Sequence, residues 1–144
     1  NEQRYRELYD NAKKTTNRPV LYPQVRGIVR YLTEIKKTIA ILSKFKKTDL
    51  INEAVDFHLI NDVPFVFQDA QNKTMGLLSL CEVCNQKPQN VLYVDDTAYG
   101  IVASQNAGVH SAGILTGYGT RAELEAAKPD FVLSILDDLK KYVH

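Results

Sequence analysis

Hydrophobic and polar residues follow two different periods along the chain. Between Tyr22 and Leu32 the apolar residues recur every three or four positions, the spacing of an amphipathic helix. Residues 38–42 then form an almost unbroken apolar run, which is typical of a buried strand. Segments of both kinds alternate to the end of the chain. We expect an amphipathic helix at the start of the chain that ends near Thr16, and further helices at 50–55, 74–84, 101–107 and 120–127. The last of these begins with a Thr-x-x-Glu capping box, Thr120 and Glu123. We expect further strands at 57–60, 64–67, 91–94, 112–115 and 131–133, and a last helix from Ser134.

This alternation predicts the fold class. Strands that read as near-continuous apolar runs, separated by helices, are typical of a mostly parallel sheet with helices on both faces. The sequence therefore predicts an α/β, doubly wound fold. In open sheets of this kind the ligand lies beyond the carboxyl ends of the strands, so the residues that follow each strand are the candidates for chemistry.

Composition and charge exclude several classes of protein. An apolar fraction of 44% with only seven Gly and five Pro excludes a disordered or fibrous chain. The net charge of +1 gives no reason to expect a nucleic acid or an anionic membrane as partner. The apolar stretches are far shorter than the roughly 18 residues of a membrane span, and no signal-peptide pattern opens the chain. We expect a soluble, cytoplasmic protein whose 144 residues form one core.

The charges are unevenly distributed. Residues 1–50 hold 12 Lys and Arg against 5 Asp and Glu, whereas residues 51–144 hold 6 against 12. This asymmetry can steer an anionic substrate, or the two halves can pack together so that their charges offset each other. Both interpretations stay open at the level of sequence.

The two cysteines form a single C-x-x-C, Cys81 and Cys84. The leucines beside them indicate a helix interior rather than the strand-to-helix turn of a redox motif. Two thiolates cannot complete a four-ligand zinc site. We therefore expect reduced thiols without a chemical role.

Polar and charged side chains follow two of the predicted strands. Ser43 and Lys44 follow the first strand, and Asp95 and Asp96 follow the strand at 91–94. Two neighbouring carboxylates at a strand end repel each other, and the usual relief is a divalent cation with oxygen ligands, such as Mg²⁺. A phosphate-bearing ligand would complete the charge balance, because the metal bridges it to the carboxylates while Ser43 donates to its oxygens. The pattern favours phosphoryl chemistry, with a solvated turn or a helix cap as the alternative explanation of the acidic pair.

The segment around VLYVDDTAYG, residues 87–139, resembles the C-terminal half of haloacid dehalogenase superfamily hydrolases, especially phosphoglycolate-phosphatase-like members. Residues 20–44 resemble the helix and the second core strand of the same family. The resemblance implies that residues 1–18 are a remnant of the family's helical cap and that residues 19–144 form its hydrolase core domain.

The resemblance also implies roles for individual residues. Ser43 matches the hydroxyl residue that binds the transferred phosphoryl group, and Lys73 in NKTMGLL matches the lysine that neutralises its charge. These two are the candidate catalytic residues, and Lys44 joins them as a candidate phosphate ligand. Asp96 matches the magnesium-binding acid, and Asp95 is the second candidate ligand of Mg²⁺.

The acidic motif departs from the usual pattern of the family. That pattern is Gly-Asp followed by a second acid four residues later, whereas here Asp95 replaces the glycine and Gly100 occupies the second acidic position. Adjacent Asp-Asp is a recognised variant. We therefore expect Asp95 to compensate for the acid that is absent at position 100.

The 144 residues contain no Asp-x-Asp, the motif whose first aspartate is the nucleophile of the family. In the family this motif ends the first core strand, which lies between the strand ending at Ser43 and the one ending at Asp95. The resemblance therefore implies a sheet that lacks its central strand and has two unpaired edges. A complementing segment, a homo-oligomer or direct closure of the two strands would satisfy these edges. We expect these residues by themselves to be inactive towards a small phosphorylated metabolite.

Two other functions fit parts of the pattern. A catalytically dead binding or assembly module on the same scaffold stays open as an alternative. A phospho-signalling receiver also combines paired acids, a hydroxyl and a lysine at strand ends. In receivers the acid pair follows the first strand, whereas here Asp95 and Asp96 come after Ser43 and Lys73, so the order of the motifs argues against this function.

Overall fold

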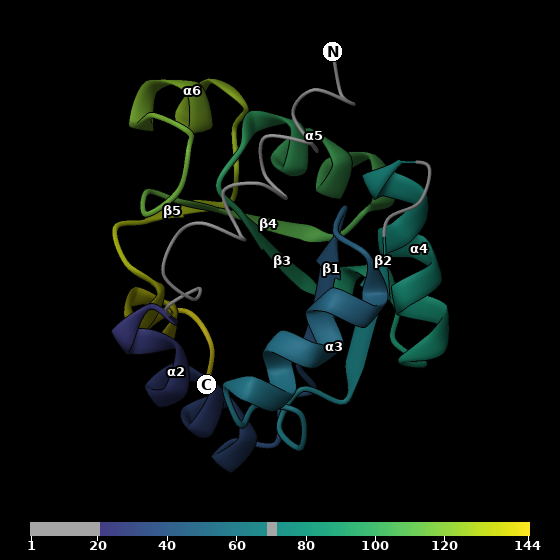
Figure 1. Ribbon diagram of the computed structural model, residues 1–144. Helices are drawn as coiled ribbons and strands as arrows, with labels where there is room; N and C mark the ends of the chain where they lie inside the picture. Colours follow the sequence, from purple (N-terminus) through teal and green to yellow (C-terminus); the bar gives the residue numbers. More distant parts are fainter. Residues whose placement is uncertain (1–20, 69–71) are drawn as a thin grey trace, which may run out of the picture.

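The computed structural model describes residues 21–68 and 72–144, in which helices and parallel strands alternate (Figure 1). This confirms the predicted α/β class. The first elements are α2 (Pro23–Glu34), β1 (Ala40–Ser43), α3 (Lys47–Asp56), β2 (Phe65–Gln68), α4 (Lys73–Val83) and the 3-10 helix η1 (Pro88–Asn90). They are followed by β3 (Leu92–Asp95), α5 (Ala98–Ala107), β4 (His110–Ile114), α6 (Arg121–Ala126), β5 (Phe131–Leu133) and the 3-10 helix η2 (Leu136–Lys141).

The strands form two parallel sheets. In one sheet β1 pairs with β2, with Ser43 opposite Gln68, and in the other β3, β4 and β5 lie in that order, with Asp95 opposite Gly113. Among residues 21–68 and 72–144, no strand pairs with both β1 and β3, and these two strands do not pair with each other. We call the space between these two strands the slot. It lies where the resemblance placed the central strand, and the two strands have not closed on each other.

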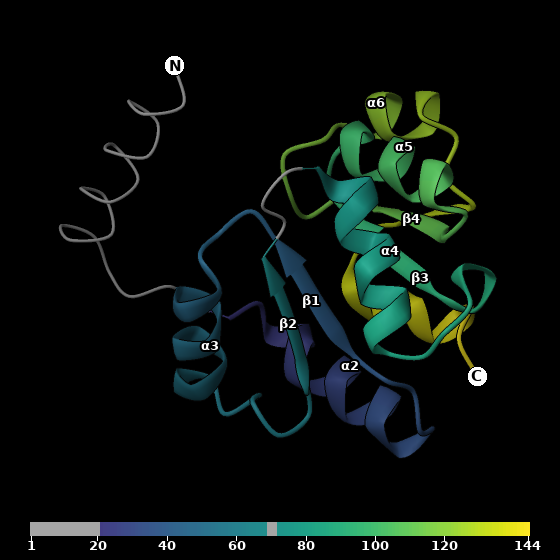
Figure 2. The same ribbon diagram turned by 90° about the vertical axis from the view of Figure 1, so that its right-hand side faces the viewer.

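Helix α4 covers one face of the slot. Its buried Leu77 lies in one core cluster with Leu42 of β1, and Tyr93 of β3 packs against the same cluster. Figure 2 shows α4 between the ribbons of β1 and β3. This helix therefore joins the two sheets.

Helix α2 covers the opposite face. Val29 packs in a cluster that includes Ile41 of β1, while its neighbour Ile28 packs with Ala112 of β4. Successive residues of a strand point to opposite faces, so Ile41 and the adjacent Leu42 place α2 and α4 on opposite sides of β1. Both sheets thus rest on the same two helices.

Capping residues fix the helices that follow the strands of the second sheet. The Thr97 side chain accepts a hydrogen bond from the backbone N–H of Gly100 at 3.1 Å and begins α5 directly after β3. Gly108 ends the same helix with φ at 71°, in the left-handed region. The predicted capping box of Thr120 and Glu123 is present at the start of α6.

Two predicted elements were wrong. Residues 57–60 form a turn rather than a strand, because His58 takes a left-handed conformation with φ at 56° after the end of α3. The apolar character of this stretch comes from Leu59, which fills the core cluster under α2. The last helix is a 3-10 helix that begins at Leu136, two residues later than predicted. The Asp138 carboxylate accepts the backbone N–H groups of Ser134 and Ile135, which precede it.

The helix predicted to end near Thr16 and the expected cap remnant at residues 1–18 lie outside the described residues. Across the two described ranges, none of the helices has both the length and the apolar character needed to cross a membrane. The helix predicted around Cys81 and Cys84 is confirmed as α4 and its C-cap, and both thiols are free.

Candidate functional site

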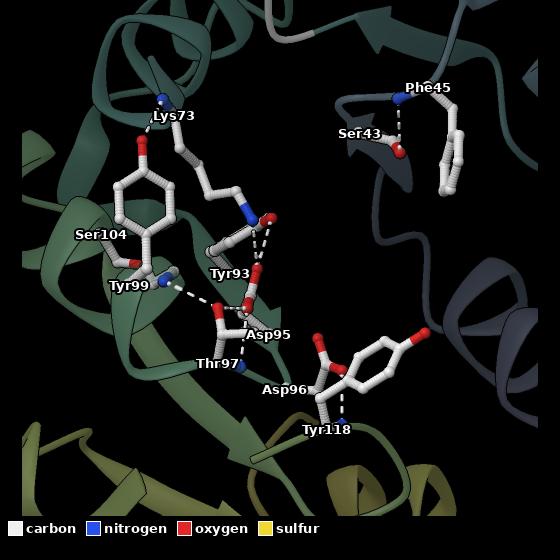
Figure 3. Close-up of polar contacts among 11 residues, drawn as sticks. Ser43, Phe45, Lys73, Tyr93, Asp95, Asp96, Thr97, Tyr99, Ser104 and Tyr118 are labelled. Atoms are coloured by element: carbon white, nitrogen blue, oxygen red, sulfur yellow. Dashed lines mark hydrogen bonds and ion pairs between the residues drawn. The ribbon is translucent and has the colours of Figure 1, made fainter. Parts of the chain in front are cut away.

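The carboxyl ends of β1 and β3 open into a cleft of about 590 Å³. Its lining includes groups from the end of β1, from the first residue of α4 and from the end of β3 (Figure 3). The structure thus brings together all five residues that the sequence singled out, and their roles in binding stay predictions. These residues are Ser43, Lys44, Lys73, Asp95 and Asp96.

Asp95 is the most tightly held carboxylate of the cleft and is only 7% exposed. Its Oδ2 accepts hydrogen bonds from the Lys73 ammonium at 2.6 Å and from the Tyr93 hydroxyl at 2.9 Å. Its Oδ1 accepts the backbone N–H of Thr97 at 2.8 Å and the Thr97 hydroxyl at 2.6 Å. Both oxygens are therefore fully engaged in hydrogen bonds from within the chain (Figure 3).

These contacts determine the charge of Asp95. Burial by itself would raise the pKa of its carboxyl, but the hydrogen bonds from Lys73 and Thr97, together with the positive charge of Lys73, hold that pKa below its ordinary value. Asp95 is therefore ionised at neutral pH. The Lys73 side chain, 12% exposed, is held as its counter-ion at the edge of the cleft.

Gly100 provides the space that Asp95 occupies. A Cβ added at position 100 would overlap the Asp95 carboxylate. The absence of a side chain at Gly100 thus leaves room for the carboxylate of Asp95. The Asp95 carboxylate lies where a side chain at position 100 would begin.

Asp96 is held differently, by the loop after β4. Its Oδ2 accepts the backbone N–H of Tyr118 at 2.9 Å, and its backbone carbonyl accepts the N–H of Gly119, also at 2.9 Å. A Cβ at Gly117 would overlap the Asp96 side chain, so this loop needs glycine for its close approach. In the described part of the chain Asp96 Oδ1 accepts no hydrogen bond.

The acidic pair fits Mg²⁺ by its chemistry. This ion prefers hard oxygen ligands and commonly keeps several waters while binding one or two carboxylates and a substrate phosphate. Asp96 offers an oxygen without a hydrogen-bond donor, whereas Asp95 would have to share oxygens that Lys73 and Thr97 already use. No cluster of three or more His, Cys, Asp or Glu occurs among the residues described, so those residues supply a carboxylate pair and not a complete cage.

Ser43 and Lys44 form the side of the cleft that belongs to the first sheet. The Ser43 hydroxyl accepts the backbone N–H of Phe45 at 3.2 Å, which leaves its own proton for donation to a ligand. The Lys44 ammonium lies over the ring of Tyr99, 4.9 Å from its centroid. The Ser43 hydroxyl thus lies across the slot from the two carboxylates, whereas the Lys44 ammonium reaches over the slot to α5.

Sequence reasoning missed the residues that hold the site together. Thr97 carried a signal, because a threonine directly after a strand and before a helix is a typical N-cap. Gly100 was noted only as the position where the usual acid is absent. Tyr93 stands two residues before Asp95, so its side chain leaves the strand on the same face. No sequence signal indicated that Tyr99 of α5 would lie beside lysines from two other segments.

Comparisons with known proteins agree with this architecture. A family model described as haloacid dehalogenase-like hydrolase matches residues 1–114. The phosphoglycolate phosphatase of Vibrio vulnificus is 29% identical over 143 residues, which cover 93% of this chain and 62% of that protein. The pyrophosphatase PpaX of Bacillus cereus is 34% identical over 113 residues, covering 78% of this chain and 49% of that protein.

A solved structure shares the fold. A haloacid dehalogenase-like family protein from Streptococcus pneumoniae matches with a TM-score of 0.79 at 15% identity, covering 85% of this chain and 59% of that one. The chain thus spans 62% or less of the length of these three proteins.

Proposed function

Since the chain belongs to the haloacid dehalogenase-like hydrolases, we propose that it forms the phosphate-binding and magnesium-binding part of a phosphoric monoester hydrolase acting on a small phosphorylated metabolite. One observation carries this proposal. A hydroxyl, two ammonium groups and two carboxylates, contributed by segments as distant in sequence as Ser43 and Asp96, line a single cleft at the carboxyl ends of parallel strands.

Each group has a chemical task in this proposal. Ser43 donates to an oxygen of the phosphoryl group, and Lys73 offsets the negative charge that develops on it. The Asp95 carboxylate keeps the Lys73 ammonium in place, so little reorganisation is needed when phosphate binds. Asp96 would hold Mg²⁺, with Asp95 beside it, and this would further neutralise the charge of the phosphate.

We also propose that turnover needs a segment carrying Asp-x-Asp, inserted in the slot. Ser43, Lys73 and Asp96 bind and neutralise, but covalent phosphoryl transfer in this family needs an attacking carboxylate. The facing edges of β1 and β3 support this requirement, because an extended segment parallel to both would end at the cleft. Its last residues would then lie beside Ser43 and Asp96.

The test is a complementation assay. We expect the 144-residue chain with Mg²⁺ to show no turnover of small phosphate monoesters above the buffer rate. Adding or fusing an apolar segment that ends in Asp-x-Asp-x-Thr should create turnover. This gain should be lost when the first aspartate of the segment is replaced by Asn, and again in Asp96→Asn. Robust turnover by the chain alone that Asp96→Asn abolishes would contradict the need for the segment.

The same assay separates the enzyme from the assembly module. A segment that binds in the slot but never gives turnover, with any monoester, would favour a catalytically dead module. If a second copy of the chain fills the slot, the molecular mass in solution should show a dimer that the added segment dissociates. Mass measurement with and without the segment checks this.

A further inference from the structure

We infer that Tyr99 is a positioning residue of the phosphate site, whose ring holds the ammonium group of Lys44 in the cleft, on the same side as that of Lys73. This inference rests on the proposed function, in which both lysines bind phosphate. It assigns a task to a residue that the usual acidic motif leaves undefined.

The three side chains come from three separate segments. Lys44 follows β1, Lys73 is the first residue of α4, and Tyr99 is the second residue of α5. The Lys44 ammonium lies 4.9 Å and the Lys73 ammonium 5.8 Å from the centroid of the Tyr99 ring. Both distances fall within the range of about 6 Å over which an aromatic face attracts a cation.

The ring itself is tied to the start of α4. The backbone N–H of Lys73 donates to the Tyr99 hydroxyl at 3.5 Å, and Figure 3 shows the ring alongside the Lys73 side chain. The backbone of Tyr99 is fixed in turn by the first turn of α5, which Thr97 caps. The first turn of α5 therefore positions the ring, and the hydrogen bond of 3.5 Å, which is long, adds little to this.

Lys44 depends on the ring more than Lys73 does. Lys73 has an ion pair with Asp95 at 2.6 Å, whereas Lys44 has no ion pair with any residue of the described ranges. An exposed lysine on a loop is otherwise free to extend into water. Mutual repulsion from Lys73 would push its ammonium away from the cleft. The aromatic face opposes this repulsion and keeps a second positive charge in the cleft, near Lys73.

The expected consequence is a modest gain in anion affinity. A cation held over an exposed aromatic face has an interaction strength that corresponds to about two- to fivefold in a binding constant. Loss of the ring should therefore weaken phosphate binding by about two- to fivefold, through Lys44. Loss of the hydroxyl alone should not, since the aromatic face remains.

The experiment measures the affinity of the 144-residue chain for inorganic phosphate, with Mg²⁺ present, by NMR titration. We expect Tyr99→Leu and Lys44→Met each to weaken binding two- to fivefold, and Tyr99→Phe to bind like the wild type. The double variant should be no weaker than either single variant, because both changes remove the same interaction. Tyr142→Leu is the matched control, since Tyr142 is 49% exposed against 50% for Tyr99 and stacks on Phe131 at the amino end of β5.

The outcomes distinguish the inference from the function on which it rests. Wild-type affinity in Tyr99→Leu, or losses that add up in the double variant, would overturn the role of Tyr99 and leave the phosphate site intact. A similar loss in Tyr142→Leu would show a general effect of removing a ring and would also overturn it. A wild-type chain that binds no phosphate would overturn the proposed function and the inference together.

Discussion

The two sheets differ in both packing and chemistry. The three-stranded sheet contains Ala112 and Leu133, which are 0% exposed, whereas Val66, the most buried residue of the two-stranded sheet, is 7% exposed. The three-stranded sheet brings two carboxylates to the cleft, and the two-stranded sheet brings the hydroxyl of Ser43 and the ammonium of Lys44. The better-packed sheet therefore presents the candidate metal ligands, and the other presents the candidate phosphate-binding groups.

The cleft brings together charges from the basic and the acidic parts of the sequence. Lys44 from the basic first third and Asp96 from the acidic remainder line the same cleft. A metal-bound phosphate needs both kinds of group, an anion site and a cation site, within a few ångströms. Helices α2 and α4 pack against both sheets and so link them. A substitution can therefore act on one sheet alone or on this link.

The largest expected effect separates the two lysines. Lys73→Met should lower the free energy of unfolding by about 3–5 kcal/mol, because it leaves the buried Asp95 carboxylate without its counter-ion. Lys44→Met should change it by no more than about 1 kcal/mol, since Lys44 is exposed, has no ion pair in the described ranges and gives up one cation–π contact with Tyr99. Urea unfolding of both variants measures the difference. Equal losses of unfolding free energy in the two variants would contradict the prediction that only Lys73 neutralises a buried carboxylate.

A second prediction concerns the link. Leu77→Ala should cost about 2–5 kcal/mol, because it opens a cavity in the cluster that α4 shares with both sheets. Amide hydrogen exchange should then show faster opening of β1 and β3 alike. The matched variant Leu133→Ala, in the core of the three-stranded sheet, should lower the protection of β3 to β5 more than that of β1. The same exchange pattern in both variants would show that the sheets open as one unit.

A third prediction concerns the close approach of Gly100 to the Asp95 carboxylate. Gly100→Ala should destabilise the protein by about 1–3 kcal/mol, because the added methyl group overlaps the Asp95 carboxylate and separates it from Lys73. Gly27→Ala is the control, since a Cβ there meets nothing within 4 Å in the middle of α2, and it should stabilise by about 0.5–1 kcal/mol. Thermal unfolding compares the two. If Gly100→Ala leaves the stability unchanged, the Asp95 carboxylate does not fill the space beside Gly100.

The sequence predicted the local features of the fold better than its long-range ones. The apolar period of α2 and the capping box at Thr120 depend on neighbours within a few residues, and both are confirmed. At residues 57–60 the same apolar signal came from a buried turn, because burial of Leu59 and strand formation produce similar local patterns. Periodicity alone does not separate them.

The candidate site shows the same division. Its rim was predicted because parallel strands bring their carboxyl ends to one edge, which needs only the positions of Ser43 and Asp96. The ion pair of Lys73 with Asp95 links residues 22 positions apart, and the contact of Lys44 with Tyr99 links residues on opposite sides of the slot. Such contacts depend on how the sheets lie on α2 and α4, which no local pattern specifies.

The smallest expected effect on stability belongs to the other acid of the pair. Asp96→Asn should change the free energy of unfolding by no more than about 0.5 kcal/mol, because an amide oxygen can still accept the N–H of Tyr118. The same change removes the carboxylate oxygen that no donor occupies in the described ranges, so metal affinity should fall at least about tenfold. Electron paramagnetic resonance with Mn²⁺ as the probe measures that affinity, and unfolding in urea measures stability. Because Asp95 is already engaged by Lys73 and Thr97, Asp95→Asn should show the reverse order, with the greater loss in stability. If Asp96→Asn binds Mn²⁺ as the wild type does, the candidate metal ligand on the three-stranded sheet is wrongly assigned.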